Sequence, residues 1–198
     1  EMLTRQNFNS EVPYEANREK PFRFGNFTIM GEFYVETGLD TLGISDYKRI
    51  LSLDSALAVV QFKKDNVAYQ RSYFISYPAN VMVMRFSADR AGMQNLVFSY
   101  APNSISQGSL SGDGDKGLVF SASLNNNGMK YVVRIQAETK GGTLSNTGCR
   151  LTVKGADEVV FYVTADTDYK MNFNPDFKDP KTYVGVDPAE TTCQWINN

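Results

Sequence analysis

The stretch VAYQRSYFISYPANVMVMRFSA, residues 67–88, decides the fold class. Apolar and polar side chains alternate through residues 67–76 and again through residues 81–88, with a break at Pro78. Alternation with a period of two places successive side chains on opposite faces of an extended strand. Proline has no amide hydrogen to donate to a neighbouring strand, so it ends the first run. The stretch therefore predicts two consecutive strands of a meander.

The same pattern extends in both directions from this stretch, and turn-forming residues separate the runs. Asp65–Asn66 precedes it, and short carboxylate and amide side chains tolerate left-handed backbone. Asn127–Gly128 is a pair favoured by type I′ turns between two strands. Further turns are expected at Ser145–Gly148 and Gly155–Asp157, and the Ser-, Gly- and Asp-rich residues 104–117 predict a long loop.

Counting these runs gives roughly ten to thirteen strands between residues 22 and 165, with no convincing amphipathic helix among them. An antiparallel chain with this many strands usually closes into two packed sheets. The predicted fold class is therefore all-β, an antiparallel β-sandwich of the supersandwich kind, with the start of a linker helix at the C-terminus.

Three segments are expected from the change of pattern along the chain. Residues 1–21 are polar and aperiodic and predict an irregular lead-in, and residues 22–186 predict the β-sandwich. Residues 187–198 predict the start of a helix, with Asp187 as N-cap and Pro188 in the first turn. Because Glu1 is not a natural start and a helix begins near the last residue, we expect a domain cut from a longer polypeptide.

Composition excludes several classes of function. The chain has no histidine, which excludes Ser-His-Asp triads and nearly all zinc sites, so no metal or cofactor is expected. A formal charge of −2 and the lack of long basic or apolar runs give no reason to expect nucleic acid or a membrane span. Cys149 and Cys193 could pair, or each could be a small buried apolar residue.

Three ordered blocks resemble a known family. They are YKRILSLDSALAVVQF (47–62), VAYQRSYFISYPANVMVMRFSADRAG (67–92) and GGTLSNTGCRLTVKGADEVVFYVTADTDY (141–169). Together they resemble the N-terminal β-sandwich domain of glycoside hydrolase family 95, the α-L-fucosidases and α-L-galactosidases. The chain departs from that family at one point, because it has Arg71–Ser72 where the family usually has Arg-Glu.

The resemblance implies a non-catalytic domain. It implies that an inverting enzyme acts on terminal α-L-fucosides or related sugars through a later (α/α)₆ barrel of the same chain, reached by a helical linker. It also implies a bacterial protein exported to the periplasm or cell surface. A free-standing carbohydrate-binding module is the main alternative, and a structural or adhesin-like sandwich is another.

Four aromatic residues near the C-terminus, Tyr169, Phe173, Phe177 and Tyr183, are candidates for contact with the barrel, or for contact with a glycan. Asp166 and Asp168 are two residues apart, which is too close for the separated carboxylates of an inverting glycosidase, so they are interpreted as capping residues.

Two further patterns have structural interpretations. Residues 111–117, SGDGDKG, do not fit the template of a calcium loop and are interpreted as a hairpin loop. Arg71 and Arg85 lie within predicted strands and are interpreted as ion-paired with a carboxylate such as Asp54.

Overall fold

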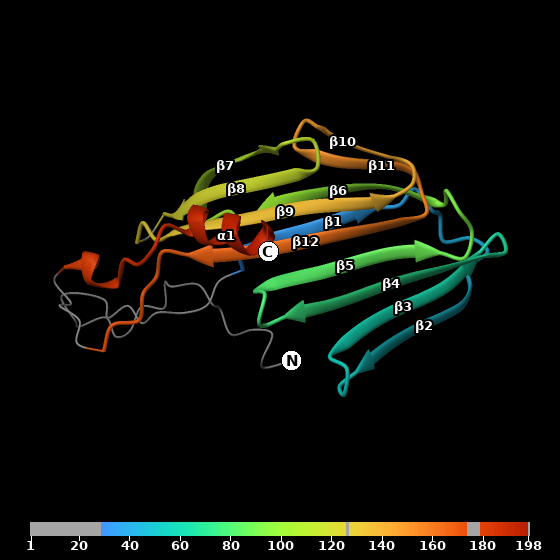
Figure 1. Ribbon diagram of the computed structural model, residues 1–198, viewed down its shortest axis with the longest axis horizontal. Coiled ribbons are helices and arrows are strands. Elements are labelled where there is room, and N and C mark those ends of the chain that lie inside the picture. Colours follow the sequence, from blue (N-terminus) through green and yellow to red (C-terminus); the bar gives the residue numbers. More distant parts are fainter. Residues whose placement is uncertain (1–28, 126, 174–178, 198) are drawn as a thin grey trace, which may run out of the picture.

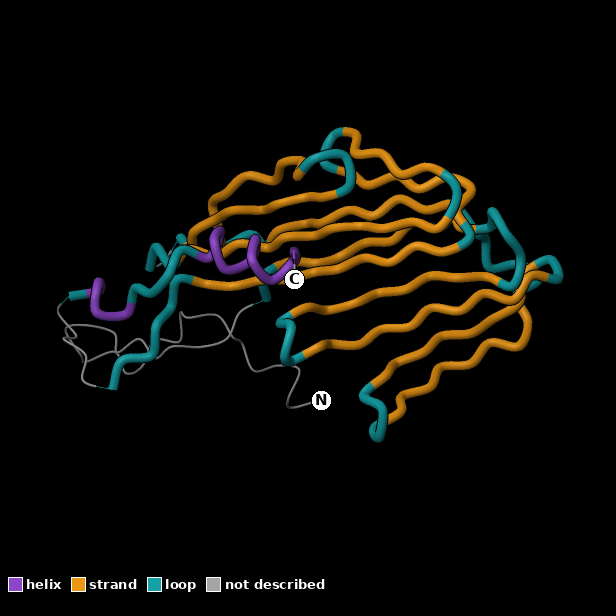
Figure 2. The backbone as a smooth tube through the Cα atoms, in the orientation of Figure 1, coloured by secondary structure: helices purple, strands orange, loops and turns teal. Residues whose placement is uncertain are grey.

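The structure is a computed structural model that describes residues 29–125, 127–173 and 179–197, and it consists of two antiparallel sheets (Figures 1 and 2). The small sheet has the strand order β1–β6–β11–β10, with β1 at Gly31–Glu36, β6 at Gln94–Pro102, β11 at Arg150–Ala156 and β10 at Thr143–Thr147. The large sheet has the order β2–β3–β4–β5–β12–β9–β8–β7. Its strands are β2 (Ser45–Ser52), β3 (Leu57–Lys64), β4 (Val67–Ser76), β5 (Val81–Ala88), β12 (Glu158–Thr167), β9 (Lys130–Lys140), β8 (Gly117–Leu124) and β7 (Ser106–Asp113).

The predicted all-β sandwich is confirmed, and the twelve strands of the described residues lie within the expected range. Residues 67–88 form the β4–β5 hairpin, in which Tyr73 pairs with Met84. Strand β4 ends at Ser76, just before Pro78, as the missing amide hydrogen of proline predicts. None of the helices in the described part of the chain is long and apolar enough to cross a membrane.

The main core lies between the small sheet and the central strands of the large sheet. Phe161 of β12 is completely buried, and its ring stacks on Phe98 of β6 with centroids 4.5 Å apart. Phe86 of β5 meets the same ring edge-on at 5.9 Å. The rest of this core alternates along the strands with outward-facing residues; its fully buried members include Leu118, Val133, Ile135, Leu151, Val153 and Val159. Three strands from two sheets therefore meet at one ring.

The predicted loop at residues 104–117 is wrong. Its first part is strand β7, which pairs with β8 along its whole length and forms an edge of the large sheet. A Cβ atom on Gly108 would lie 2.3 Å from the carbonyl oxygen of Ser121, so the close approach of the two backbones requires glycine there. Only the end of the segment, between Asp113 and Gly117, is the interpreted hairpin turn.

The predicted turns are partly confirmed. Asp65 and Asn66 both have positive φ angles, of 51° and 59°, as a two-residue turn between β3 and β4 requires. The β8–β9 connection spans residues 125–129 and is longer than a type I′ turn, although Gly128 does have a positive φ of 74°. The β10–β11 turn lies at Gly148–Cys149, later than predicted.

The predicted C-terminal helix is present as α1, Pro188–Asn197, and a short 3₁₀ helix precedes it at Pro180–Tyr183. Asp187 caps α1, because its carboxylate accepts a hydrogen bond of 2.9 Å from the Ala189 amide. Figure 1 shows α1 lying across β12 and β9, the two strands that it contacts. The thiols of Cys149 and Cys193 are not joined.

The large sheet is wider than the small one and extends beyond it at β2, β3 and β4, as Figure 1 shows in its lower right part. A second, smaller cluster of buried residues lies on this extension: Phe62, Val67 and Tyr69, with Leu39, Ile44, Val60, Ala88 and Met93 packed around them. Residues 37–44, which connect β1 to β2, thus take part in covering the face that the small sheet leaves open.

Replacing Phe161 by alanine should remove the ring on which both sheets converge. The expected loss in the free energy of unfolding is about 3–5 kcal/mol, from lost burial and the cavity left behind. Urea denaturation followed by circular dichroism measures it. The control is Leu42→Ala, because Leu42 is 77% exposed and should change stability by less than about 0.5 kcal/mol. A loss below about 1 kcal/mol for Phe161→Ala would contradict this description of the core.

Candidate functional site

A groove lies where residues 37–44 cross the extension of the large sheet. Lys64 of β3 holds this segment, because its ammonium group lies 2.8 Å from a carboxylate oxygen of Asp40 and also donates to the carbonyl of Leu42. The hydrogen bond from Lys64 lowers the pKa of the Asp40 carboxyl and raises that of the Lys64 amine. Lys64 therefore ties the middle of the segment, at Asp40 and Leu42, to strand β3. An open space remains between the segment and the sheet.

The open space has a volume of about 450 Å³, within the range of small-molecule sites. Strands β2, β3 and β4 and the connecting segment supply its walls, which comprise Thr37, Leu39, Thr41, Ile44, Tyr47, Arg49, Val60, Phe62, Arg71 and Tyr73. We call it the β2–β4 groove. Two of these residues are arginines and none is acidic, so the walls of the groove carry net positive charge.

Arg71 lies on the sheet floor of the groove. Its guanidinium carbon is 5.2 Å from the centroid of the Phe62 ring and 5.8 Å from that of Phe86, so the cation faces two aromatic rings. Among the ion pairs of the described residues none involves Arg71 or Asp54, so the predicted pairing of these two is wrong. Burial raises the pKa of the Tyr73 hydroxyl, and the nearby charge of Arg71 partly opposes that shift.

Arg49 is in line with Arg71 across the sheet. Val60 of β3 pairs with Arg49 on one side and with Arg71 on the other, so all three side chains project from the same face. Two strand spacings separate the two arginine backbones by roughly 10 Å. Arg49 is exposed, and it too makes no ion pair within the described part of the chain.

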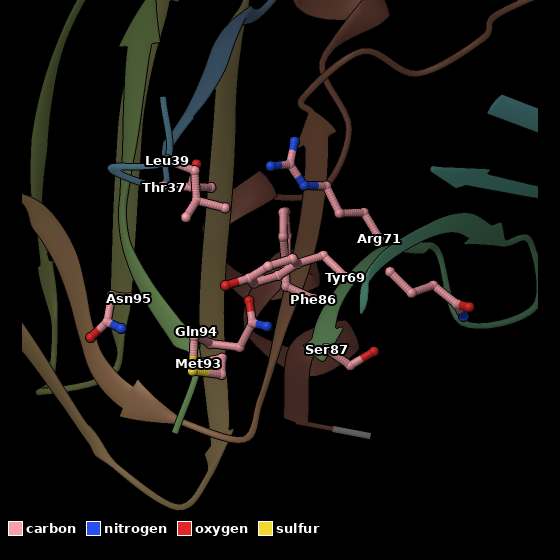
Figure 3. A pocket seen from close by; sticks show the side chains of 10 residues that line it. Thr37, Leu39, Tyr69, Arg71, Phe86, Ser87, Met93, Gln94 and Asn95 are labelled. Atoms are coloured by element: carbon pink, nitrogen blue, oxygen red, sulfur yellow. The ribbon is translucent and has the colours of Figure 1, made fainter. Parts of the chain in front are cut away.

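A second, much smaller cavity adjoins the groove and shares Thr37, Leu39 and Arg71 with it (Figure 3). Its volume of about 10 Å³ is close to the minimum that one water molecule needs. Gln94 of β6 is 6% exposed and lines this cavity, and its side-chain nitrogen has no hydrogen-bond partner among the described atoms. Figure 3 shows Gln94 beside the Tyr69 ring, with the Arg71 guanidinium directed towards Thr37 and Leu39.

The four aromatic candidates near the C-terminus are partly brought together. Tyr169 and Tyr183 stack with ring centroids 6.2 Å apart, because a β-bridge pairs Tyr169 with Val184. Phe173 is 95% exposed and Tyr169 is half exposed. Phe177 lies outside the described residues. Met171, Val184 and Val186 are also exposed, so this C-terminal segment presents several apolar side chains to solvent.

Asp166 and Asp168 have structural roles at the end of β12, but through partners far away in the sequence and not through the local Asx-type hydrogen bonds of capping residues. Asp168 accepts a hydrogen bond of 3.0 Å from the Lys130 amide, at the start of β9. Asp166 accepts one of 2.5 Å from the hydroxyl of Thr191 in α1. Both carboxylates therefore have structural partners. No group of three His, Cys, Asp or Glu side chains that could hold a metal ion is found among the described residues.

Arg85 is ion-paired as expected, but with Glu158 of the neighbouring strand β12 and not with Asp54. Residues 85 and 160 are direct partners in the sheet, which brings Glu158 within reach along the same face of β12. The hydrogen bond from Arg85 lowers the pKa of the Glu158 carboxyl.

The β2–β4 groove was missed by sequence reasoning, because Arg49 and Arg71 are 22 residues apart and each lies in an ordinary alternating strand. The one available signal was the position of both arginines on the same face as aromatic residues of their own strands, Tyr47 and Tyr73.

Residues 3–172 match the family model described as "Glycosyl hydrolase family 65, N-terminal domain". The chain belongs to this family. The match supports the prediction of an N-terminal domain of a glycosyl hydrolase, and it gives the family number 65 where the sequence resemblance named family 95.

This family 65 N-terminal domain is 28% identical over 190 residues to a protein of Aspergillus niger named "Probable alpha-fucosidase A". The aligned part is 91% of this chain and 23% of that relative, so the chain spans about a quarter of its length. A solved structure titled "Putative kojibiose phosphorylase from human microbiome" is 12% identical with a TM-score of 0.48, over 77% of this chain and 24% of that one.

The Arg85–Glu158 pair should make the stability of the family 65 N-terminal domain depend on pH. The pKa of Glu158 in the folded state lies below its ordinary value. The pair therefore adds to the free energy of unfolding at pH values above the pKa of the unfolded state, and this contribution is lost as the pH falls through the pKa of the folded state. Both side chains are partly exposed, so Glu158→Gln should lower the free energy of unfolding at pH 7 by only about 0.5 kcal/mol.

Urea denaturation of wild type and Glu158→Gln from pH 7 to pH 2.5 measures this difference. It should disappear at the acidic end. Asp115→Asn is the matched control, since Asp115 is exposed in the β7–β8 turn and forms none of the described ion pairs. A Glu158→Gln difference that persists unchanged at low pH would show that charge is not its cause.

Proposed function

We propose that this chain is the non-catalytic N-terminal domain of a glycosyl hydrolase that acts on terminal α-L-fucosides or related sugars. The observation that carries the proposal is the family match over residues 3–172. The fungal relative named as an alpha-fucosidase supports the sugar, and its much greater length supports a further domain in the same polypeptide. The three sequence blocks that resemble family 95 support the same substrate class.

The role of the domain in this proposal is to support an (α/α)₆ catalytic barrel. The exposed apolar side chains of the C-terminal segment, above all Phe173 and Tyr169, favour it as the contact surface. Apolar side chains that cluster in an exposed segment commonly pack against another protein surface. The helix α1 follows this segment directly and would begin the linker to the barrel.

The alternative is a free-standing carbohydrate-binding module, and the β2–β4 groove is the observation that favours it. A groove of about 450 Å³ with tyrosine rings in its walls has the form of a small-molecule site. The two functions differ in the size of the native polypeptide. Ligand binding in the groove is compatible with both, because a domain that supports a barrel can also bind a ligand.

The experiment that separates them is an immunoblot of the source cells with an antibody raised against this chain. A band several times heavier than the 22.1 kDa chain is expected, and the purified heavy protein should hydrolyse 4-nitrophenyl α-L-fucoside. Comparison with the α-L-galactoside analogue would rank the two sugars. A band near 22 kDa would contradict the proposal and support the free-standing module. A heavy protein inactive on both substrates would contradict the substrate class alone.

The contact surface can be tested in the same heavy protein with the double variant Met171→Ser/Phe173→Ser. If these side chains pack on the barrel, the temperature at which fucosidase activity is lost should fall by about 2 °C or more. The isolated 198-residue chain should be unaffected, because both side chains are exposed in it.

Leu42→Ser is the matched control for this test, because Leu42 is also exposed but lies in the β1–β2 connection. An equal effect of the control, or no effect of the double variant, would exclude the C-terminal segment as the contact surface.

A further inference from the structure

We propose that the β2–β4 groove binds a carbohydrate that carries a carboxylate, namely a hexuronate unit. This site lies on the β-sandwich itself. The proposal does not depend on which sugar the parent enzyme cleaves, nor on whether a catalytic barrel follows.

Charge is the first reason for an acidic ligand. Arg49 and Arg71 both line the groove, no acidic residue does, and within the described residues neither arginine forms an ion pair. This positive site lies on a chain whose formal net charge is −2. A concave surface lined by charges of one sign concentrates counter-ions, and a guanidinium group matches the two oxygens of a carboxylate.

The position of Arg71 is the second reason. Its guanidinium group faces the rings of Phe62 and Phe86, which limits the conformations that the side chain can adopt before any ligand arrives. An arginine that is already ordered loses less conformational entropy on binding than a free surface arginine does. Arg49 projects from the same side of the sheet two strands away, and both arginines line the groove, so a ligand in it lies beside both cations.

The remaining walls favour a sugar over a free anion or a peptide. Tyr47 is 57% exposed and presents an aromatic ring that can stack on the apolar face of a pyranose, and Tyr73, half buried against Phe86, adds part of a second ring to the wall. The hydroxyls of Thr37 and Thr41 make no hydrogen bond to other described residues, so both are available to sugar hydroxyls. A volume of about 450 Å³ is also much larger than an inorganic anion needs.

Titration of the 198-residue chain with sodium D-glucuronate and D-galacturonate tests the proposal, followed by NMR of backbone amides and arginine side chains. Saturable shifts should concentrate at Tyr47, Arg49 and Tyr73. D-Glucose lacks the charge and acetate lacks the ring, so each should bind about tenfold more weakly or worse at equal ionic strength. Added sodium chloride should weaken uronate binding by screening.

Variants link the binding to the groove. Arg49→Gln should weaken uronate binding about tenfold. This variant should fold, because Arg49 is exposed and makes none of the described ion pairs, and thermal unfolding followed by circular dichroism checks that it does. The matched control is Arg150→Gln, an exposed arginine on the small sheet, which should leave the affinity unchanged.

Five results would overturn the proposal. If acetate bound as tightly as uronate, the groove would be a site for carboxylates that does not recognise the sugar ring. If glucose bound as tightly as uronate, the carboxylate charge would not contribute to binding. Tighter binding of a glutamate-rich hexapeptide would assign the groove to a protein partner. If neither uronate showed saturable binding, or if Arg49→Gln left the uronate-induced shifts unchanged, the groove would be excluded as a hexuronate-binding site. None of these results bears on whether the longer polypeptide hydrolyses fucosides, so the proposed function and the proposed hexuronate site can fail separately.

Discussion

The structure depends on one mismatch: a sheet of four strands packs against a sheet of eight. The small sheet covers the centre of the large one, and the Phe98–Phe161 stack at 4.5 Å marks the middle of the buried layer. Strands β2–β4 extend beyond that cover, and their inner face would lose its burial without other contacts. Residues 37–44 supply some of them, since Leu39 and Ile44 pack onto Phe62, Val67 and Tyr69. The β2–β4 groove is the part that this segment leaves open.

The fold class could be predicted from the sequence because alternation of apolar and polar residues reports directly on a half-buried sheet. A turn that requires positive φ angles could also be predicted from the sequence, and Asp65–Asn66 is an example, because both residues have positive φ. Strand β7 could not be predicted from the sequence, because Ser and Gly are common in loops. Glycine is required at position 108 only because the backbone of β8 lies so close to it. The strand character of β7 comes from pairing and not from its own side chains.

The candidate site was harder to predict than the fold, for a related reason. The β2–β4 groove joins residues from three strands and a connecting segment, and their convergence depends on register and on the width of the large sheet. The aromatic residues of the C-terminal segment were identifiable because they lie close together in the chain, although only Tyr169 and Tyr183 were found in contact. The partner of Arg85 was mistaken because Glu158 is distant in sequence but adjacent in the sheet.

Strand β7 also affects how the molecule meets its own copies. As the outer strand of the large sheet it pairs with another strand on one side only, and an edge strand of this kind can recruit another chain into an intermolecular sheet. Part of its backbone is already occupied, because the Leu110 carbonyl accepts a hydrogen bond from the Cys149 thiol. Its sequence SQGSLSGD offers Leu110 as its only large apolar side chain, so a recruited strand would gain little dry contact. The composition that hides β7 from sequence-based recognition therefore also makes this edge a poor template for aggregation.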